Sequence, residues 1–174
     1  IKYFEEEKIH LEKFYNYKNL KLLNKHQVKD EIQSNIYESG LINYGSYHIN
    51  PLKFLLGIGN QIKSTKIKVF ENTPITKIIE HEDSIYCYSN LKKIKSKKVI
   101  VGCNGYLDNL LSNIRKRFMP INNYVIATEP LGEKKARELI KNNHAVCDTR
   151  FIIDYYRFSE DWRLIFGGGE TYSA

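Results

Sequence analysis

The four residues at positions 154–157, Asp-Tyr-Tyr-Arg, have types and a spacing that suit the binding of a carboxylate. Side chains alternate between the faces of a β-strand, so Tyr155 and Arg157 lie on one face and Asp154 and Tyr156 on the other. A guanidinium offers a fork of N–H donors that matches a carboxylate. The pattern therefore predicts a carboxylate-binding face. The alternative is an ordinary sheet face on which Arg157 pairs with an acidic side chain.

A second candidate lies where a short β-branched run at positions 99–101 ends in the small or polar residues Gly102, Cys103 and Asn104. This pattern is typical of a buried parallel strand, whose C-terminal end meets the ligand-binding crevice of an α/β sheet. Small residues there allow the backbone to approach a dinucleotide closely. The alternative is a tight strand-to-helix turn in which Asn104 is the N-cap.

The elements around these residues follow from the period of the apolar positions. Asn50 and Pro51 are favoured at the N-cap and first position of a helix, which we predict to run to about Lys63, and His48 immediately precedes it. A period of two predicts strands at 67–69, 75–80 and 85–88, the last two joined by a turn at 82–83. Beyond a basic linker at 115–120 we predict strands at 124–128, 145–147 and 151–158, a helix at 132–141 and a return strand at 162–167. A helix is also expected at 104–113.

The amino-acid composition limits the classes of protein to which the chain can belong. The 174 residues are 42% hydrophobic and 27% charged, as in an ordinary globular protein of one large or two small domains. No apolar run approaches the roughly 18 residues of a membrane span. Cys87, Cys103 and Cys147 show no C-x-x-C spacing, so we expect no metal site and reduced thiols, which fits a cytoplasmic location. The first residue is Ile rather than Met, so we expect a piece of a longer chain.

The net charge of +7 allows two interpretations. One is a nucleic-acid or anionic-surface partner. The other is the compositional drift of an AT-rich genome, which scattered lysines and scattered acids favour. The densest basic run, at 92–98, is expected to be an exposed hairpin arm. We therefore expect no nucleic-acid partner.

Three segments, taken in order, resemble the FAD-dependent D-amino-acid oxidase superfamily, and within it the bacterial γ-glutamylputrescine oxidoreductase branch. They are His-Ile-Asn-Pro at 48–51, the strand and turn at 97–107, and Asp-Tyr-Tyr-Arg at 154–157 with Arg-Leu-Ile-Phe-Gly-Gly-Gly at 163–169. Val-Ile-Ala-Thr-Glu-Pro-Leu at 125–131 is similar as well. The resemblance runs from about Leu22 to the C-terminus.

This resemblance implies an enzyme that oxidises the C–N bond of a small-molecule amine or amino acid by hydride transfer to FAD. It places the backbone of Ile75 at the adenine ring, and Gly102, Cys103 and Asn104 against the cofactor. Each of these has a structural alternative, since Ile75 also suits an ordinary β-branched strand. No catalytic residue and no metal ligand is implied.

For the substrate, the resemblance places His48 near the isoalloxazine ring, where a histidine steers the substrate or tunes the flavin. The alternative is a histidine hydrogen-bonded to local backbone. Tyr155 and Arg157 would lie on a sheet that covers the flavin, and a γ-glutamyl substrate would present a carboxylate to them.

The expected fold is α+β, part of a two-domain flavoprotein. Residues 1–47 form a helical crossover beside the substrate domain, residues 48–117 an α/β part of the FAD domain, and residues 118–174 part of a mixed or antiparallel substrate-domain sheet. The G-x-G-x-x-G loop that holds a pyrophosphate is not in this sequence. We therefore expect the chain to need N- and C-terminal segments of the same enzyme, and alone to be inactive and not to retain FAD. The alternatives are a non-catalytic basic module that binds RNA or an anionic surface, and a decayed remnant of an enzyme.

Overall fold

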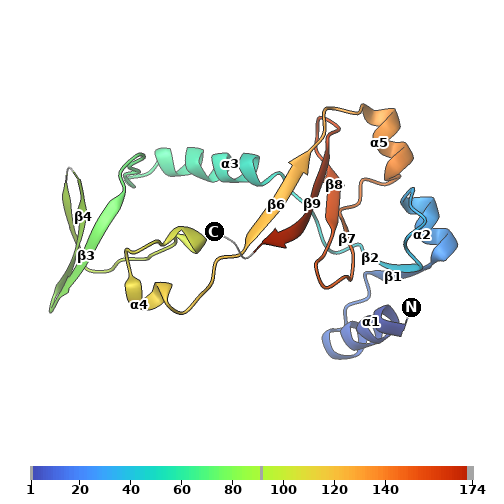
Figure 1. Cartoon of the computed structure of the whole chain (residues 1–174), viewed down its shortest axis with the longest axis horizontal. Coiled ribbons are helices and arrows are strands. Elements are labelled where there is room, and N and C mark those ends of the chain that lie inside the picture. Colours follow the sequence, from blue (N-terminus) through green and yellow to red (C-terminus); the bar gives the residue numbers. More distant parts are fainter. Residues whose placement is uncertain (1, 91, 172–174) are drawn as a thin grey trace. The chain divides into compact units, whose positions relative to one another are not determined.

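The computed structural model of the chain describes residues 2–90 and 92–171, and these form a mixture of helices and sheets (Figure 1). The helices are α1 (Lys2–Tyr15), α2 (Lys25–Glu31), α3 (Pro51–Lys63), the 3₁₀ turn η1 (Asn104–Tyr106), α4 (Ser112–Arg115) and α5 (Glu133–Leu139). The strands are β1 (Leu20–Asn24), β2 (Ser39–Asn43), β3 (Ile75–His81), β4 (Ser84–Ser89), β5 (Lys93–Ser96), β6 (Asn122–Ala127), β7 (Val146–Cys147), β8 (Tyr155–Phe158) and β9 (Leu164–Thr171). The α+β composition expected from the sequence is confirmed.

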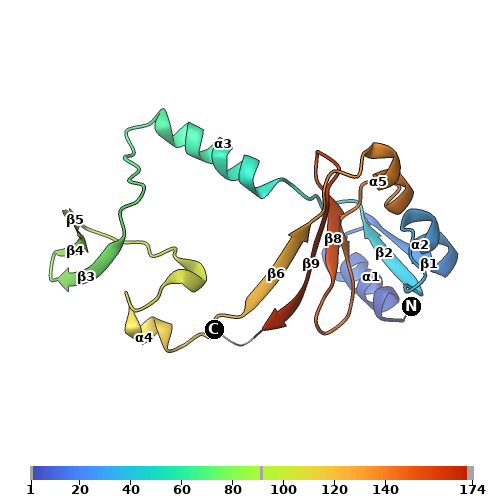
Figure 2. The ribbon, with the colours of Figure 1, turned by 45° about the horizontal axis from the view of Figure 1, so that its top comes forward.

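The chain divides into two compact units. The first unit comprises the residues up to Phe54 together with Asn123–Thr171, and the second comprises Leu55–Asn122. The first contains the antiparallel pair β1-β2 and a four-stranded sheet in the order β6-β9-β8-β7. The second contains an antiparallel sheet in the order β3-β4-β5 (Figure 2).

The core of the first unit forms where α5 packs on one face of β8. Ala136 of α5, Ile140 and Phe158 of β8 are almost fully buried together. Tyr156 lies on the same face of β8 as Phe158, as strand alternation requires. The opposite face of this strand is therefore left for Tyr155 and Arg157.

Backbone hydrogen bonds tie the N-terminal segment to α5. Gln33 donates to the carbonyl of Leu139 at 2.9 Å, and Lys141 donates to that of Glu31 at 3.0 Å. Asn24 and Gln27 form a capping box at the start of α2, so this short helix begins at a defined residue. It ends at Glu31, because Ile32 turns to an extended conformation and bridges to Ile140.

Helix α3 begins where the sequence indicates. The Asn50 side chain accepts a hydrogen bond from the Lys53 N–H at 3.0 Å, and Pro51 takes the first helical position. Lys53 also forms an ion pair with Glu160 in the turn between β8 and β9. The cap and this ion pair hold the residues before α3, including His48, against the first unit.

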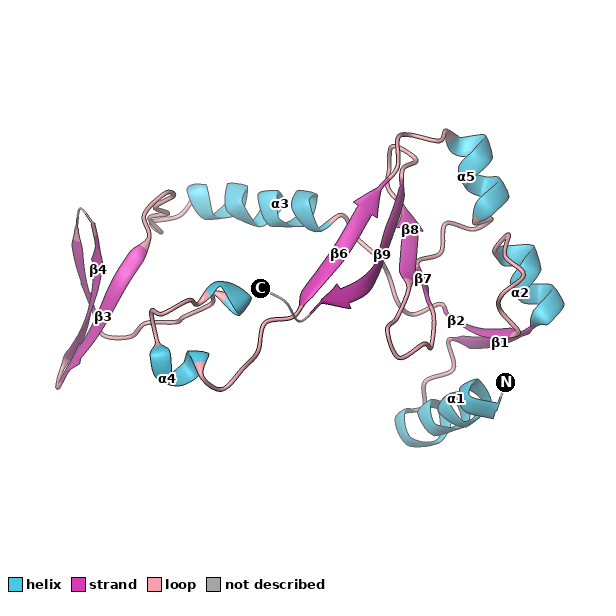
Figure 3. Cartoon of the chain, in the orientation of Figure 1, coloured by secondary structure: helices cyan, strands magenta, loops and turns pink. Residues whose placement is uncertain are grey.

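Two predicted strands and one predicted helix do not form. Residues 67–69 and 99–102 have irregular backbone (Figure 3). Ile100 is 96% exposed. A strand needs a neighbouring strand to satisfy its N–H and C=O groups, and in the described part of the chain neither segment has one. The expected helix at 104–113 is replaced by η1 and α4, because Asn104 and Asp108 both have left-handed backbone, with φ of 50° and 46°. The prediction of a parallel strand at 99–102 is therefore wrong.

Strand β8 is also shorter than the strand predicted from the sequence. The strand expected at 151–158 begins only at Tyr155, because Asp148 accepts backbone N–H groups of Arg150 and Asp154 and holds the intervening residues in a loop. The three glycines at 167–169 lie within β9, and Gly169 has a φ of 72°. Among the described residues, no helix is long and apolar enough to cross a membrane.

Candidate functional site

Arg157 and His48 meet on the face of β8 that is turned away from α5. Arg157 pairs with Ile165 of β9 in the sheet, and its Nη1 lies 3.4 Å from Nδ1 of His48. Arg157 is partly buried, and within residues 2–90 and 92–171 it forms no ion pair with a carboxylate. The structural alternative for this arginine, an acidic partner, is therefore not what the structure contains.

The two ring contacts of His48 together fit one tautomer. A guanidinium only donates, so Nδ1 accepts from Arg157. Nε2 lies 2.9 Å from the carbonyl oxygen of Asn143, which only accepts, so Nε2 carries the proton. Both contacts are made together by the neutral Nε2–H tautomer. The backbone partner of His48 is 95 residues away in the sequence, so this is a tertiary contact rather than a local one.

Tyr155 lies on the same face, two residues before Arg157. Its hydroxyl donates to Oδ1 of Asn123 at 2.5 Å. Its ring lies over Gly167, its partner across β8 and β9, so closely that a Cβ at Gly167 would be 2.1 Å from the ring. The hydrogen bond to Asn123 fixes the phenol, and the ring fits in its place because Gly167 has no side chain.

Tyr156, on the opposite face of β8, is packed against other residues of the protein. Its ring stacks on Phe166 with centroids 5.8 Å apart, and its hydroxyl donates to that of Tyr37 at 3.1 Å. Burial, followed by the hydrogen bond with Tyr37, raises the pKa of the Tyr156 phenol well above its ordinary value. Tyr156 therefore stays protonated at physiological pH and acts as a packing residue.

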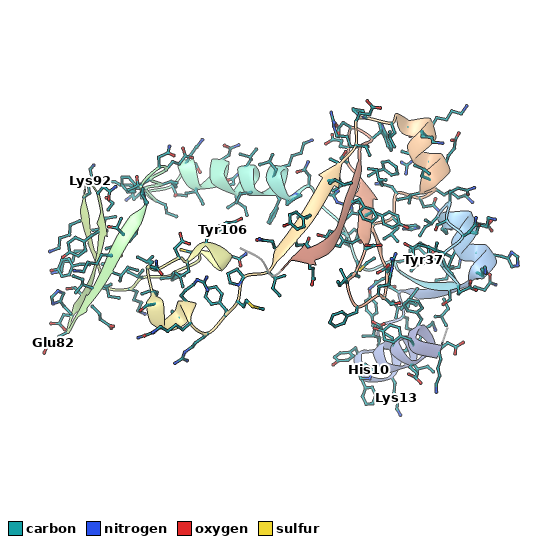
Figure 4. The ribbon with its side chains drawn as sticks, viewed as in Figure 1. His10, Lys13, Tyr37, Glu82, Lys92 and Tyr106 are labelled. Atoms are coloured by element: carbon teal, nitrogen blue, oxygen red, sulfur yellow. The ribbon has the colours of Figure 1, made fainter. Side chains whose placement is uncertain are left out.

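A pocket of about 920 Å³ lies in the first unit and has His48 in its wall. Its lining includes residues of β2 and of the segment before it, among them Tyr37 (Figure 4), and residues 143–150. Because the His48 ring also contacts Arg157, this residue joins the pocket to the face of β8 that carries Tyr155 and Arg157. A ligand in the pocket would reach the same imidazole as a ligand on β8.

Polar groups line this pocket. Glu31 lies 3.5 Å from Nε2 of His144 and accepts a hydrogen bond from Asn142 at 2.6 Å. Arg150 forms ion pairs with both Asp148 and Asp154. These contacts were not predicted from the sequence, since Glu31 lies 111 residues from Asn142 and no local pattern marks the pairing of Arg150 with Asp148 and Asp154.

Asp148 is the most buried of these acids, with 5% of its side chain exposed. Desolvation alone would raise its pKa. The hydrogen bonds from the Arg150 side chain and from the N–H groups of Asp154 and Arg150 outweigh that effect, so the pKa of Asp148 lies below its ordinary value. The carboxylate is thus a stable negative charge in the pocket wall.

The residues predicted to contact FAD lie in the second unit and form no cradle. Ile75 is the first residue of β3 and pairs with Ser89. Gly102 and Cys103 are in exposed irregular chain, Asn104 is in η1, and a Cβ at Gly102 would meet nothing within 4 Å. A pyrophosphate needs convergent backbone donors, which these residues do not supply. The residues of this chain therefore do not form a complete FAD site. Among the residues described, no group of three or more His, Cys, Asp or Glu side chains suits a metal ion.

Comparison with known proteins identifies relatives over nearly the whole sequence. The chain is 36% identical over 171 residues to the gamma-glutamylputrescine oxidoreductase of Escherichia coli, covering 98% of this chain and 40% of that protein. It is 33% identical over 163 residues to a probable oxidoreductase, OrdL, of Haemophilus influenzae, covering 91% of this chain and 38% of that protein. The OrdL of Rhizobium meliloti is 29% identical over 160 residues, which are 92% of this chain and 37% of its own length. The chain thus spans about two fifths of the length of these relatives.

The profile of the family described as FAD dependent oxidoreductase (DAO) matches residues 2–174. The match extends over both units and includes every candidate residue described above. The chain belongs to the DAO family of FAD-dependent oxidoreductases.

Proposed function

We propose that the protein to which this chain belongs uses FAD to oxidise the C–N bond of an amine or amino acid, and that the chain supplies part of the substrate-binding surface. Family membership supports the oxidoreductase class. The name of the Escherichia coli relative supports a substrate that carries a γ-glutamyl group. Such a substrate presents a carboxylate at a distance from the amine that is oxidised.

The observation that carries the proposal is Arg157, a partly buried arginine without an acidic partner in the described part of the chain. Its contact with the neutral His48 fixes one edge of the guanidinium and leaves its other N–H donors for a ligand. Tyr155 projects from the same face of β8. Arg157 and Tyr155 are thus proposed to bind the substrate carboxylate, and His48 to position Arg157 and contact the substrate.

We assign residues 48–117 to the FAD domain, residues 118–174 to the substrate domain, and residues 1–47 to a segment beside the substrate domain. The hydrogen bonds between α2 and α5 support the last assignment. Ile75, Gly102, Cys103 and Asn104 are proposed to lie along FAD once the rest of its site is present, because the chain itself contains no G-x-G-x-x-G.

The test compares two amines that differ only in the γ-glutamyl group. Putrescine and γ-glutamylputrescine are supplied to the flavin-loaded enzyme that carries this chain, and amine oxidation is followed as substrate loss under oxygen or an artificial electron acceptor. We expect γ-glutamylputrescine to be oxidised with a much lower KM. Equal KM values would contradict the carboxylate-binding role, and no oxidation of either amine would contradict the proposed substrate class.

A further inference from the structure

The sheet β3-β4-β5 has one face on which lysines flank tyrosines. Strand register places Lys77, Tyr88 and Lys93 in one row across the three strands. It places Ile79, Tyr86 and Lys95 in the next. Paired residues in an antiparallel sheet point to the same side, so the two rows share a face.

Two of the three lysines on this face, Lys93 and Lys95, lie over tyrosine rings. Nζ of Lys93 is 3.9 Å from the centroid of Tyr86 and 5.5 Å from that of Tyr88, and Nζ of Lys95 is 5.8 Å from that of Tyr86. All three lysines are exposed, and none forms an ion pair with a carboxylate among the residues the structure describes. The contacts are cation–π contacts of solvent-accessible ammonium groups, which cost little to exchange.

Acidic residues lie away from this face. Glu80, next to Ile79 in β3, points to the opposite side by strand alternation. Glu82 and Asp83 form the turn between β3 and β4, and Figure 4 shows Glu82 and Lys92 at opposite ends of the hairpin. The face therefore carries lysines in both rows, and Glu82 and Asp83 lie in the turn at one end of the β3-β4 hairpin.

The other face of the sheet has a different character. Ile78, Cys87 and Ile94 are cross-strand partners there, and Cys87 is buried. An apolar face on one side leaves the lysine–tyrosine face as the solvent side of the sheet. The electrostatics of that side also act on Tyr86, whose pKa is lowered by a hydrogen bond with Ser84 and by the charges of Lys95 and Lys93.

We propose that the lysine–tyrosine face of β3-β4-β5 binds single-stranded RNA. Lysines neutralise phosphates, and the partly exposed tyrosine rings accept stacked bases, as on other sheets that bind single strands. Tyr86 and Tyr88 are two residues apart on one strand, about 7 Å at 3.4 Å per residue, so each ring takes its own base. On binding, Lys93 exchanges its contact with a ring for one with a phosphate. This binding is separate from the proposed amine oxidation, and it departs from the expectation of no nucleic-acid partner that the scattered lysines of the sequence suggested.

Single-stranded RNA is favoured over two other anionic partners. Paired bases in a duplex do not expose their faces to a sheet, so the tyrosines would have no role there. A lipid surface would require apolar side chains that project beyond the lysines, whereas Tyr86 and Tyr88 are only partly exposed beneath them. Single-stranded RNA is the partner that uses both the positive charges and the tyrosine rings of this face.

The test measures fluorescence anisotropy of a labelled oligouridine on addition of the 174-residue chain over a series of salt concentrations. Neutralisation of phosphates by three lysines predicts that the logarithm of the binding constant falls with the logarithm of salt with a slope of about −2. We expect Lys93→Gln with Lys95→Gln to weaken binding at least about tenfold. The control is Lys134→Gln with Lys135→Gln on α5, which removes the same charge elsewhere and leaves binding within about twofold.

The tyrosines separate stacking from charge. Replacement of Tyr86 and Tyr88 by Leu should weaken RNA binding about tenfold or more, whereas replacement by Phe keeps the rings and should preserve it. Circular dichroism checks that each variant retains its sheet. The proposal is overturned if the α5 control weakens binding as much as the β5 pair or if the Leu variants bind as tightly as the Phe variants. Failure to bind RNA at physiological salt also overturns it, with or without binding to phosphatidylserine vesicles.

Discussion

Arg157 differs from the other arginines of the first unit in what it contacts. Arg150 and Arg163 each form ion pairs with aspartates close to them in the sequence. Arg157 instead contacts the neutral ring of His48, 109 residues away. An arginine whose donors are not taken by acids retains the capacity to bind a ligand carboxylate.

Arg157→Lys should raise the KM for a carboxylate-bearing amine. Lysine keeps the charge but loses the planar fork, and loss of a charge-assisted hydrogen bond of about 1.5–3 kcal/mol corresponds to a rise of roughly 10- to 100-fold. The flavin-loaded enzyme is assayed over a range of substrate concentrations, and kcat should change less than KM. Arg137→Lys is the matched control, because Arg137 lies over Trp162 on α5 and away from this face. An unchanged KM in Arg157→Lys would contradict the assignment.

The lowered pKa of Asp148 leads to a prediction about how the stability of the fold depends on pH. The pKa of this carboxyl is lowered in the folded chain from an ordinary value of 3.8, so its contribution is fully present above that value and is lost as pH falls below it. Asp148→Asn should therefore be less stable than the native chain near neutrality and should lose less stability on acidification. Urea midpoints measured at several pH values test this. Asp30→Asn, at an exposed position on α2, is the control, and parallel pH profiles for native and Asp148→Asn chains would contradict the prediction.

At the scale of elements, the pairing of β8 with β9 depends on one glycine. The ring of Tyr155 fills the space over Gly167, so Gly167→Ala forces the ring or the strand to move. We expect a loss of about 1–3 kcal/mol in the free energy of unfolding, as in other overpacked sites. It is measured by urea denaturation.

The matched control is Gly57→Ala in α3, where a Cβ would meet nothing within 4 Å. Alanine in a helix interior is favoured over glycine by roughly 0.5–1 kcal/mol, so this variant should be as stable as the native chain or more so. Equal effects of the two substitutions would show that the contact between Tyr155 and Gly167 does not constrain the sheet.

The elements that the sequence predicts well are those with local determinants. The cap at Asn50, the turn at 82–83 and the alternation along β8 each depend on residues close together in the chain, and each forms as expected. Strands at 67–69 and 99–102 do not form, because a β-branched run becomes a strand only beside a partner. The sequence also did not indicate that Asn104 and Asp108 adopt left-handed backbone conformations, which interrupt the predicted helix.

The same distinction holds for the candidate site. The alternation of side chains along a strand is enough to place Tyr155 and Arg157 on one face. The contacts of His48 with Arg157 and Asn143, and the pocket beside them, join segments about 100 residues apart, and no periodicity encodes such contacts. The face on which Tyr155 and Arg157 lie was thus predictable, but their arrangement with His48 was not.

At the scale of the whole molecule, the two units carry different parts of the proposed chemistry. The first unit contains Tyr155, Arg157 and His48, which already contact their neighbours. The second contains the predicted FAD-contacting residues, of which Gly102 and Cys103 are exposed. The proposed substrate-binding face therefore needs less from the remainder of the enzyme than the proposed FAD site does, and the chain spans about two fifths of the length of its relatives.

The purified 174-residue chain should accordingly not retain FAD. A pyrophosphate is bound by N–H groups of a glycine-rich loop and helix N-terminus, and the sequence contains no G-x-G-x-x-G. The chain is purified in the presence of excess FAD, desalted and denatured, and released flavin is quantified by its visible absorption. A relative of full family length, treated in the same way, is the control. One flavin per chain would contradict the prediction and would mean that the exposed residues around Gly102 rearrange to form the site without further segments.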